Sequence, residues 1–581
     1  MKRKIYSYLL ILLISVMVVS PINAQSVIPV SPYDFPFGYP FPDYPVAGAS
    51  HPSLSNDYMS KAPFDGHVKR VAQYALRLIQ TDRAFEALNF TSEYKERFPG
   101  YMDQEIFFMQ SMAHSQLGQL NAAASSMRKA IDVAELPPQR FLAGPRRMFS
   151  SFNTHEEFIS LWESYQNKLI HGPMLGAMTD SSVSVWVRTV TETPVQVAVS
   201  TSPDMTDPVV SGPVLSRAEA DYTAEILVDG LQPDTRYYYQ MLIGSELEPF
   251  QGEGQSFRTY PEQGQPADFQ IAFGGGGGYT PFNERIWDTI RRYDPIAFLT
   301  LGDNVYIDDP ESPDQQRLMY YQRQSRPEFR RLVESRPVYA IWDDHDFSMN
   351  DSWGGPKVDV PYWKPMVWEI FKQNWVNPKY GGGAQHPGVW FDFKIADVHF
   401  IMLDGRYYRE DPGRLGGEGV PNPSMLGSNQ LEWLQQTLIR STATFKVLVS
   451  PVPWNTEAKP GRGGLDTWAG FKEEREEIFS WIEEYDIEGV VLMSADRHRS
   501  DAWVTERDDS YDLYEFTSSQ FTNIHTHPVM DGSLFGYNDK NSFGLIHFNT
   551  DAKDPEVTYR IVDINGKLQK SFTVKLSQLT N

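Results

Sequence analysis

Six short apolar runs in the C-terminal half of the chain constrain the fold more than any other feature. They alternate with amphipathic segments such as "FNERIWDTIRRY", and they read "FQIAF", "IAFLTL", "PVYAIW", "VHFIML", "FKVLVS" and "GVVLMS". Short apolar runs of this kind are typical of buried strands, and helical segments between them indicate a layered α/β domain. We assign this domain to residues 263–581, closed by a terminal hairpin that turns at Asn565 and Gly566.

Glycines or polar side chains follow five of these runs, at the point where each predicted strand ends. In open α/β sheets a ligand usually lies at the carboxyl ends of the strands. The polar groups that follow the runs are Asp303, Asn304 and Tyr306; Asp343, Asp344, His345, Asp346, Asn350 and Asp351; Asp404 and Arg406; and Asp496, Arg497, His498 and Asp501. Any one cluster is compatible with a solvated loop, but their recurrence predicts one shared site. Asp303 is the first candidate ligand.

The density of carboxylates predicts a metal centre. Carboxylates this close together repel one another unless a multivalent cation neutralises them. The chain has no cysteine, so oxygen and imidazole ligands suited to Ca²⁺, Mg²⁺, Mn²⁺ or Fe remain, and Ca²⁺ is our first expectation. A di- or trinuclear centre of this type activates a water molecule and holds the attacking and leaving oxygens of a phosphoryl transfer.

A glycine run follows the first predicted strand. Gly274–Gly278 lead to Thr280 and Pro281, which are suited to the N-cap and first position of a helix. Such a loop exposes backbone N–H groups that can bind an anion such as phosphate. We therefore expect Gly276 to contact the substrate, and the other expected substrate-binding residues are Asn304 and Arg497.

Two further regions precede the α/β domain. Residues 171–262 alternate with period two, as in "SVSVWVR" and "VQVAVS", which predicts a small β-sandwich that resembles fibronectin type III domains. Residues 57–170 have helical periodicity, with Ala87 and Ala122 in similar places 35 positions apart. This spacing indicates tetratricopeptide-like helical hairpins, although an ordinary helical bundle gives much the same pattern. A protein partner could bind this helical region.

The N-terminus has the pattern of an exported protein. A basic start, an apolar run from Tyr8 to Ser20 and small residues ending at Ala24 predict a signal peptide over residues 1–24. We therefore expect a secreted or periplasmic protein. Residues 25–56 are rich in proline and aromatics and are expected to form an extended linker. After the signal, the sequence contains no apolar segment long enough for a membrane helix.

The net charge restricts the class of partner. The chain carries a formal charge of -23. Nucleic-acid binding depends on basic patches that release counterions from phosphates, so this charge argues against nucleic acid as the main partner. An acidic surface keeps a secreted protein soluble and is compatible with cation binding.

The order of the motifs resembles one known family. The segments "GDNVY", "WDDHD" followed by "ND", "LDGRYYR", "MLGSNQLEWL" and "SADRHRSD" lie behind a predicted β-sandwich. From about His171 to the C-terminus, they look like the PhoD-like alkaline phosphatase family of metallophosphoesterases. The resemblance implies a secreted phosphomonoesterase or phosphodiesterase, with a sandwich domain followed by a four-layer α/β/β/α core.

The resemblance also implies roles for single residues. Asp303 resembles the carboxylate that bridges two metals, and Tyr306 resembles the phenolate ligand of an iron. His345 stands where a histidine protonates the leaving group or steadies the transition state, and Arg406 where an arginine meets the phosphate. Asp351 is an alternative to the implied ligand Asn350, because the loop spacing varies across the family. Those remaining implied ligands are Asp344, Asn350, Asp496 and His498.

The chain departs from the family at the end of the first strand. The family has an Fe(III)-binding cysteine there, whereas this chain has glycines and no cysteine at all. Either the centre holds only calcium-like ions, or Tyr279 or Asn283 replaces the cysteine, or the site has lost activity. The role of Tyr306 depends on the same choice. His525 and His527 are further imidazoles that we interpret as structural.

Two functions from different classes follow. The first is a secreted metal-dependent phosphoric ester hydrolase, favoured by the five strand ends. The alternative is a surface binding or scaffold protein on a degenerate phosphatase core, favoured by the missing cysteine and the added helices.

Overall fold

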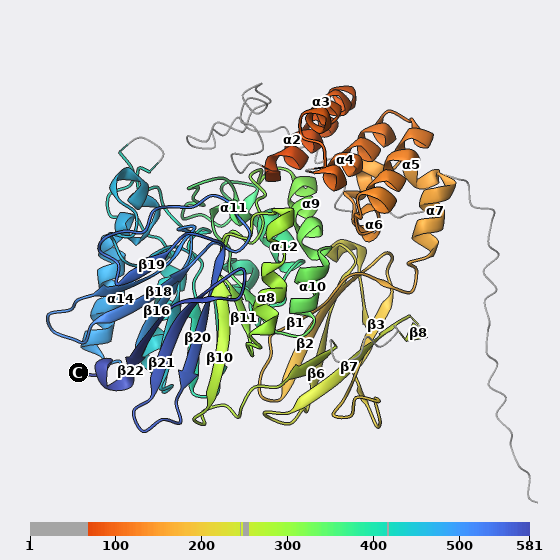
Figure 1. Ribbon diagram of the computed structural model, residues 1–581. Helices are drawn as coiled ribbons and strands as arrows, with labels where there is room; N and C mark the ends of the chain where they lie inside the picture. Colours follow the sequence, from red (N-terminus) through yellow and green to blue (C-terminus); the bar gives the residue numbers. More distant parts are fainter. Residues whose placement is uncertain (1–67, 101, 245, 248–254, 415–417) are drawn as a thin grey trace, which may run out of the picture.

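The computed structural model describes residues 68–581 apart from residues 101, 245, 248–254 and 415–417 (Figure 1). The predicted signal peptide and linker lie outside these residues. The described chain forms a helical region, a β-sandwich and a two-sheet core (Figure 1). None of the helices among the described residues is long and apolar enough to cross a membrane.

The helical region comes first. Its helices are α2 (Val68–Gln80), α3 (Ala84–Arg97), α4 (Asp103–Gln116), α5 (Leu120–Arg128), α6 (Gln139–Ala143) and α7 (Glu156–Glu163). α4 is buried on most of its surface, because its Phe108 ring packs edge-on against Phe141 and Phe149 at 5.0 and 5.5 Å. The tetratricopeptide relation stays a prediction.

The β-sandwich has two antiparallel sheets. A three-stranded sheet has the order β1-β2-β6, with bounds Leu169–Gly176, Ser182–Thr189 and Thr223–Asp229. The second sheet contains β3 (Pro194–Ser200), β4 (Val209–Val210), β5 (Val214–Leu215), β7 (Arg236–Ile243), β8 (Glu246–Leu247) and β9 (Ser256–Arg258). Alternate residues of β7 are buried, as the period-two pattern predicts. The fibronectin relation stays a prediction.

The core consists of two mixed sheets. The first core sheet has the order β12-β11-β10-β20-β21-β22, with bounds Val338–Ala340, Phe298–Thr300, Asp268–Gly274, Ser542–Asn549, Glu556–Asp563 and Leu568–Lys575. The second core sheet has the order β13-β14-β15-β16-β18-β17-β19, with bounds Phe391–Ile395, Val398–Met402, Phe445–Val449, Val490–Ser494, Leu513–Ser518, Ser500–Thr505 and Phe535–Tyr537. All six apolar runs form strands, namely β10, β11, β12, β14, β15 and β16, which confirms the predicted α/β core.

Aromatic side chains hold the two core sheets face to face. Phe548 of β20 lies 5.7 Å from Phe400 and 5.9 Å from Phe445 between ring centroids, and Tyr339 of β12 stacks on Phe393 of β13 at 3.8 Å. Helices pack outside the sheets; for example, Trp287 of α8 contacts Phe298 of β11. The core helices are α8 (Ile286–Arg292), α9 (Pro313–Gln324), α10 (Pro327–Val333), α11 (Asp344–Phe347), α12 (Lys364–Lys372), α13 (Gly427–Arg440) and α14 (Lys472–Glu484).

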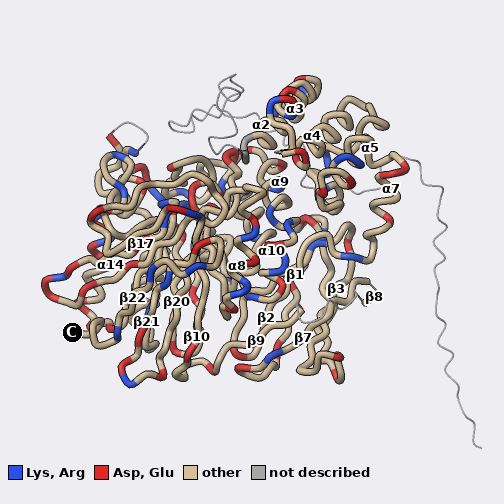
Figure 2. The backbone as a smooth tube through the Cα atoms, in the orientation of Figure 1, with Lys and Arg blue, Asp and Glu red and all other residues tan. Residues whose placement is uncertain are grey.

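The parallel strands bring their carboxyl ends to one rim. β10, β11 and β12 run parallel in the first core sheet, and β14, β15 and β16 run parallel in the second. α11 follows the end of β12, and α2 lies at the same end of the core, beside α9 (Figure 1). Acidic and basic residues are interspersed over all three parts of the described chain (Figure 2).

Candidate metal centre

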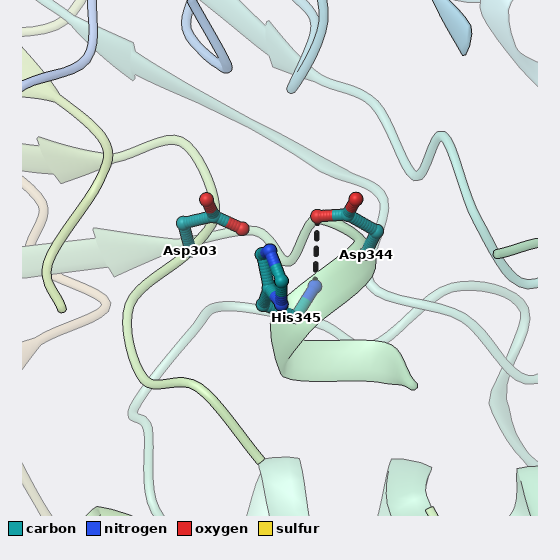
Figure 3. A group of neighbouring side chains, drawn as sticks. All are labelled: Asp303, Asp344 and His345. Atoms are coloured by element: carbon teal, nitrogen blue, oxygen red, sulfur yellow. Dashed lines mark hydrogen bonds between the residues drawn. The ribbon is translucent and has the colours of Figure 1, made fainter. Parts of the chain in front are cut away.

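A carboxylate pair and an imidazole meet at the rim. Asp303 follows β11, and Asp344 and His345 open α11 after β12 (Figure 3). One ligand atom from each of the three lies within 4.8 Å of the others. Among the described residues, the buried Oδ1 atom of Asp303 has no hydrogen-bond partner. A buried carboxylate oxygen without a donor is costly, so the group fits a bound cation.

A second carboxylate group shares Asp344. Ligand atoms of Asp344, Asp351 and Asp466 also lie within 4.8 Å of one another. Basic side chains surround this second group, with Lys459 Nζ 3.5 Å from Asp351 and 3.8 Å from Asp466. The basic residues that pair with its carboxylates are Arg406, Arg409, Arg414 and Lys459. The protein therefore supplies much of the countercharge here, whereas Asp303 depends more on an added cation.

The pKa values of the carboxyls in this centre shift in both directions. Burial, together with Asp344 and the other neighbouring carboxylates, raises the pKa of Asp303 well above its usual value. Burial and Asp466 raise the pKa of Asp351 to about 7. Burial also opposes ionisation of Asp466, but Arg406 and Arg409 hold the pKa of this carboxyl below its usual value. Burial therefore outweighs the basic partners of Asp351, and carboxyls whose pKa is raised in this way retain protons that a cation can displace.

Tyr306 binds its neighbours as a phenol. Its Oη donates to Asp303 Oδ2 at 2.8 Å and accepts from Asn523 Nδ2 at 2.6 Å. Burial and the nearby Asp303 raise the pKa of Tyr306 well above its usual value. The donor set thus has no thiolate, so it lacks the cysteine of the family's iron site. Oxygen and imidazole donors suit a hard divalent cation instead.

The backbone N–H of Gly276 faces the protein, and its predicted contact with substrate stays a prediction. This N–H is directed at the Gly302 carbonyl at 3.4 Å, and the Gly277 N–H donates to the Asp303 carbonyl at 2.6 Å. Gly276 has a φ of +70°, and a Cβ there would lie 2.5 Å from the Ser519 carbonyl oxygen. The glycine loop therefore lets backbone segments approach closely beneath Asp303, and these N–H groups face the protein.

Asn304 is held inside the protein and does not face a substrate. Its Oδ1 accepts from the Thr300 hydroxyl, and its Nδ2 donates to the Ile341 carbonyl at 2.8 Å. Its side chain is buried, and its backbone N–H donates to Asp346 at 3.0 Å. Asn304 therefore joins the ends of β11 and β12, which corrects the predicted substrate role.

Arg406 pairs with carboxylates, not with a phosphate. Its Nε lies 2.6 Å from Asp343 Oδ1, and its Nη1 lies 2.8 Å from Asp466 Oδ1. The side chain is fully buried. The guanidinium therefore neutralises the acidic centre and has no face toward an incoming ester, which corrects its predicted role.

The last strand-end motif reaches the same centre. His498 Nε2 lies 3.9 Å from Asp303 Oδ2, and Asp496 pairs with Arg497 at 3.3 Å and with Lys459 at 3.7 Å. The structure thus brings the predicted ligands Asp496 and His498 to the rim. The Arg497 side chain is buried beside Asp496, so any contact with substrate would come from the edge of its guanidinium.

Asn350 lies away from the centre. Its side chain is exposed, whereas the next residue, Asp351, is buried and accompanies Asp344. The backbone N–H of Asp351 donates to Asp344 Oδ2 at 2.6 Å, which turns the Asp351 side chain inward. Of the two predicted alternatives, Asp351 lies in the carboxylate group, and the exposed Asn350 remains an untested prediction.

Several site residues had no decisive signal in the sequence. Asp308 accepts from His345 Nδ1 at 2.5 Å, yet it reads only as one more acid after Tyr306. Asp466 and Lys459 lie in a glycine-rich loop with no periodicity. His525 and His527, interpreted as structural, lie beside the site, with ring centroids 5.3 and 5.9 Å from that of His498.

Backbone conformation sets these residues apart. Five non-glycine residues of the site have left-handed φ angles between 45° and 65°, namely Asp303, Asp308, Asp351, Asp496 and His498. This region is unfavourable for residues with a side chain, although aspartate tolerates it better than most. Strain of this kind clusters at functional sites, where the surrounding structure holds it in place.

The fold and the acidic centre define the class as a metallophosphoesterase-like α/β protein. Two solved structures share this fold: that of PhoD (TM-score 0.59, 18% identity, 70% of this chain and 90% of that chain) and that of purple acid phosphatase PPD1 from yellow lupin seeds (TM-score 0.50, 11% identity, 70% and 75%).

The sequence comparisons identify the family. The PhoD-like phosphatase model matches residues 272–578, and the model of the PhoD-like phosphatase N-terminal domain matches residues 158–261. The chain belongs to the PhoD-like phosphatase family. It is 24% identical to alkaline phosphatase D of Bacillus subtilis over 335 residues (50% of this chain, 55% of that protein). It is 26% identical to purple acid phosphatase 21 of Arabidopsis thaliana over 246 residues (41% and 45%). The chain thus spans about half the length of these curated relatives.

Replacing Asp351 by Asn tests whether ionisation of this buried carboxyl lowers the free energy of unfolding. Because the folded-state pKa of Asp351 is raised from 3.8 to about 7, ionisation of this carboxyl destabilises the metal-free fold as the pH rises between these values. In chelator, the unfolding free energy of Asp351→Asn relative to wild type should rise over this pH range by more than about 1 kcal/mol. Urea unfolding at several pH values measures it.

The exposed Asp509 supplies the matched control, since Asp509→Asn removes a carboxylate that faces water. Its unfolding free energy should track wild type at every pH. A pH-independent difference between Asp351→Asn and wild type would contradict the electrostatic account of the second carboxylate group.

Proposed function

We propose that this protein is a secreted metal-dependent hydrolase of phosphoric mono- or diesters. The observation that carries the proposal is the group of Asp303, Asp344 and His345, whose ligand atoms lie within 4.8 Å of one another at the strand-end rim. Membership of the PhoD-like phosphatase family supports the same reaction class.

The carboxylates Asp303 and Asp344 would hold a divalent cation, with Ca²⁺ as the first expectation and Mg²⁺, Mn²⁺ or Fe as the others. A bound cation of this kind supplies Lewis acidity and lowers the pKa of a water molecule. Tyr306 fixes the Asp303 carboxylate through the 2.8 Å hydrogen bond, so one oxygen stays directed at the phenol and the other at the centre.

His345 is the proposed proton donor to the leaving group. Asp308 holds its Nδ1 at 2.5 Å, which leaves Nε2 as the nitrogen available on the side of Asp303 and Asp344. A carboxylate on Nδ1 orients the ring, so that Nε2 is the nitrogen that would give a proton to the leaving group. The half-buried position of His345 leaves it reachable from solvent.

The alternative is a catalytically degenerate binding or scaffold protein. It is motivated by the missing thiolate and by Gly275, where a Cβ would lie 2.9 Å from the Gly302 carbonyl oxygen, so no side chain fits in its place. Turnover decides between the two functions, because a degenerate core would release no phosphate under any metal.

Removal of the metal or of Asp303 tests the proposal. Chelation should abolish hydrolysis of aryl phosphate mono- and diesters, and a divalent cation should restore it. Asp303→Asn should lower kcat/KM by a factor of about 100 or more, because a neutral amide stabilises the cation less. The matched control, Asp508→Asn at an exposed position, should leave it unchanged.

Circular dichroism must show that Asp303→Asn remains folded. Turnover of the folded variant at the wild-type rate would contradict the proposed centre. Failure of wild type to turn over any ester with Ca²⁺, Mg²⁺, Mn²⁺ or Fe would instead favour the binding function.

Export is inferred from the N-terminal sequence, which lies outside the described residues. The basic start and apolar run should direct secretion or periplasmic delivery, with cleavage after Ala24. N-terminal sequencing of the exported protein should begin near Gln25. An intact N-terminus on protein that stays in the cytoplasm would refute this part of the proposal.

A further inference from the structure

Helix α2 has a polar stripe that is packed against the core. Gln73, Arg77 and Gln80 recur at positions i, i+4 and i+7, so they share one face of the helix. Polar faces of helices usually meet water, but these three side chains meet the segment that follows Tyr306. The helix therefore contacts the chain next to the proposed centre.

Each member of the stripe has a defined partner. Arg77 Nη1 donates to Asp309 Oδ2 at 2.8 Å, and Gln80 Nε2 donates to Ser312 Oγ at 3.0 Å. Gln73 Nε2 donates to the Tyr306 carbonyl at 2.5 Å and reaches Asp308 Oδ2 at 3.4 Å. Gln73 is 5% exposed, so these contacts are shielded from water.

Both partners of Gln73, Asp308 and Tyr306, contact His345 directly. Asp308 contacts Gln73 through Oδ2 and His345 Nδ1 through Oδ1, the latter at 2.5 Å. Tyr306, whose carbonyl Gln73 holds, packs its ring 4.3 Å from the His345 ring between centroids. The Ile307 N–H, between these two residues, donates to the His345 carbonyl at 2.9 Å.

Asp308 needs outside support to hold this arrangement. Its φ of 48° is left-handed, a region that is unfavourable for a residue with a side chain even though aspartate tolerates it better than most, so neighbouring contacts help to hold it. Gln73 supplies donors on the carboxylate and on the carbonyl two residues earlier. Helix α2 lies outside residues 158–261 and 272–578, so this support comes from a region that the two family models do not cover.

We propose that Gln73 is a positioning residue for His345, acting through Asp308 and the Tyr306 carbonyl, so that the helical region completes the active site. The inference rests on the proposed hydrolase function, because Gln73 is proposed to position His345, the proton donor of that reaction. Misplacement of a reacting group by about 1 Å can lower a rate by about a hundredfold. Loss of the Gln73 amide should therefore act on turnover.

The test compares two identical substitutions on one helix face. Gln73→Met removes both N–H donors at similar side-chain length, and Gln80→Met does the same at the contacts to Ser312 and Asp314. With metal-loaded full-length protein, Gln73→Met should lower kcat about tenfold or more while KM stays within about twofold. Gln80→Met should keep the wild-type kcat, with metal content unchanged in both variants.

The leaving group separates positioning from general damage. Phenyl phosphate has a more basic leaving group than 4-nitrophenyl phosphate and depends more on a proton donor. The loss of kcat in Gln73→Met should therefore be larger for the phenyl ester. An equal loss for both esters, or a loss shared by Gln80→Met, would show that α2 matters only for stability and would overturn the inference.

A double-mutant cycle tests the route through Asp308. If Gln73 acts in part through this carboxylate, Gln73→Met should lower kcat by a smaller factor in an Asp308→Asn background than in wild type. Independent effects that multiply would overturn the route. Wild-type turnover with an unaffected Gln73→Met variant overturns this inference alone, whereas an inactive wild type overturns the proposed function and this inference with it.

Discussion

The concentration of buried carboxylates at one rim is the constraint on which the rest of the structure depends. The buried acids of this rim are Asp303, Asp343, Asp344, Asp346, Asp351 and Asp466. An uncompensated charge is costly in a buried site, so each must be protonated, paired or bound to a cation. Arg406 pairs with Asp343 and Asp466, while Asp303 keeps a buried oxygen without a donor among the described residues. The protein therefore neutralises one part of the centre and leaves the other to a cation.

Packing and backbone contacts position the residues around the centre. Two core sheets held together by aromatic rings fix the strand ends, and the glycine loop lets backbone pass directly beneath Asp303. Left-handed φ angles at Asp303 and Asp308 survive because neighbouring contacts hold them. The helical region adds Gln73 to these contacts, although the models of the family do not extend to it. Helix α2, which precedes the matched domains in the sequence, thus contacts Tyr306 and Asp308 next to the proposed centre.

The strands and the polar residues that directly follow them could be predicted from the sequence, because a buried parallel strand needs an apolar run and fixes the residues at its end. Asp303, Asp344 and His345 belong to this class. The loops could not be predicted in this way. The chain has a left-handed φ at Asp351, where Asn350 is exposed and Asp351 is buried, so the choice between these two predicted ligands depends on a loop conformation that has no sequence pattern. Arg406 looked like a phosphate ligand because pairing with Asp466, distant in sequence, leaves no local pattern.

The most direct test of the account is calorimetric titration of a divalent cation into chelator-treated protein. If buried carboxyls around Asp303 hold protons until a cation displaces them, binding should be saturable and should release about one proton or more near neutral pH. The apparent binding enthalpy should then differ between two buffers of different ionisation enthalpy. Absence of saturable binding, or identical enthalpies in both buffers, would contradict the claim that the rim is a metal centre built on protonated carboxyls.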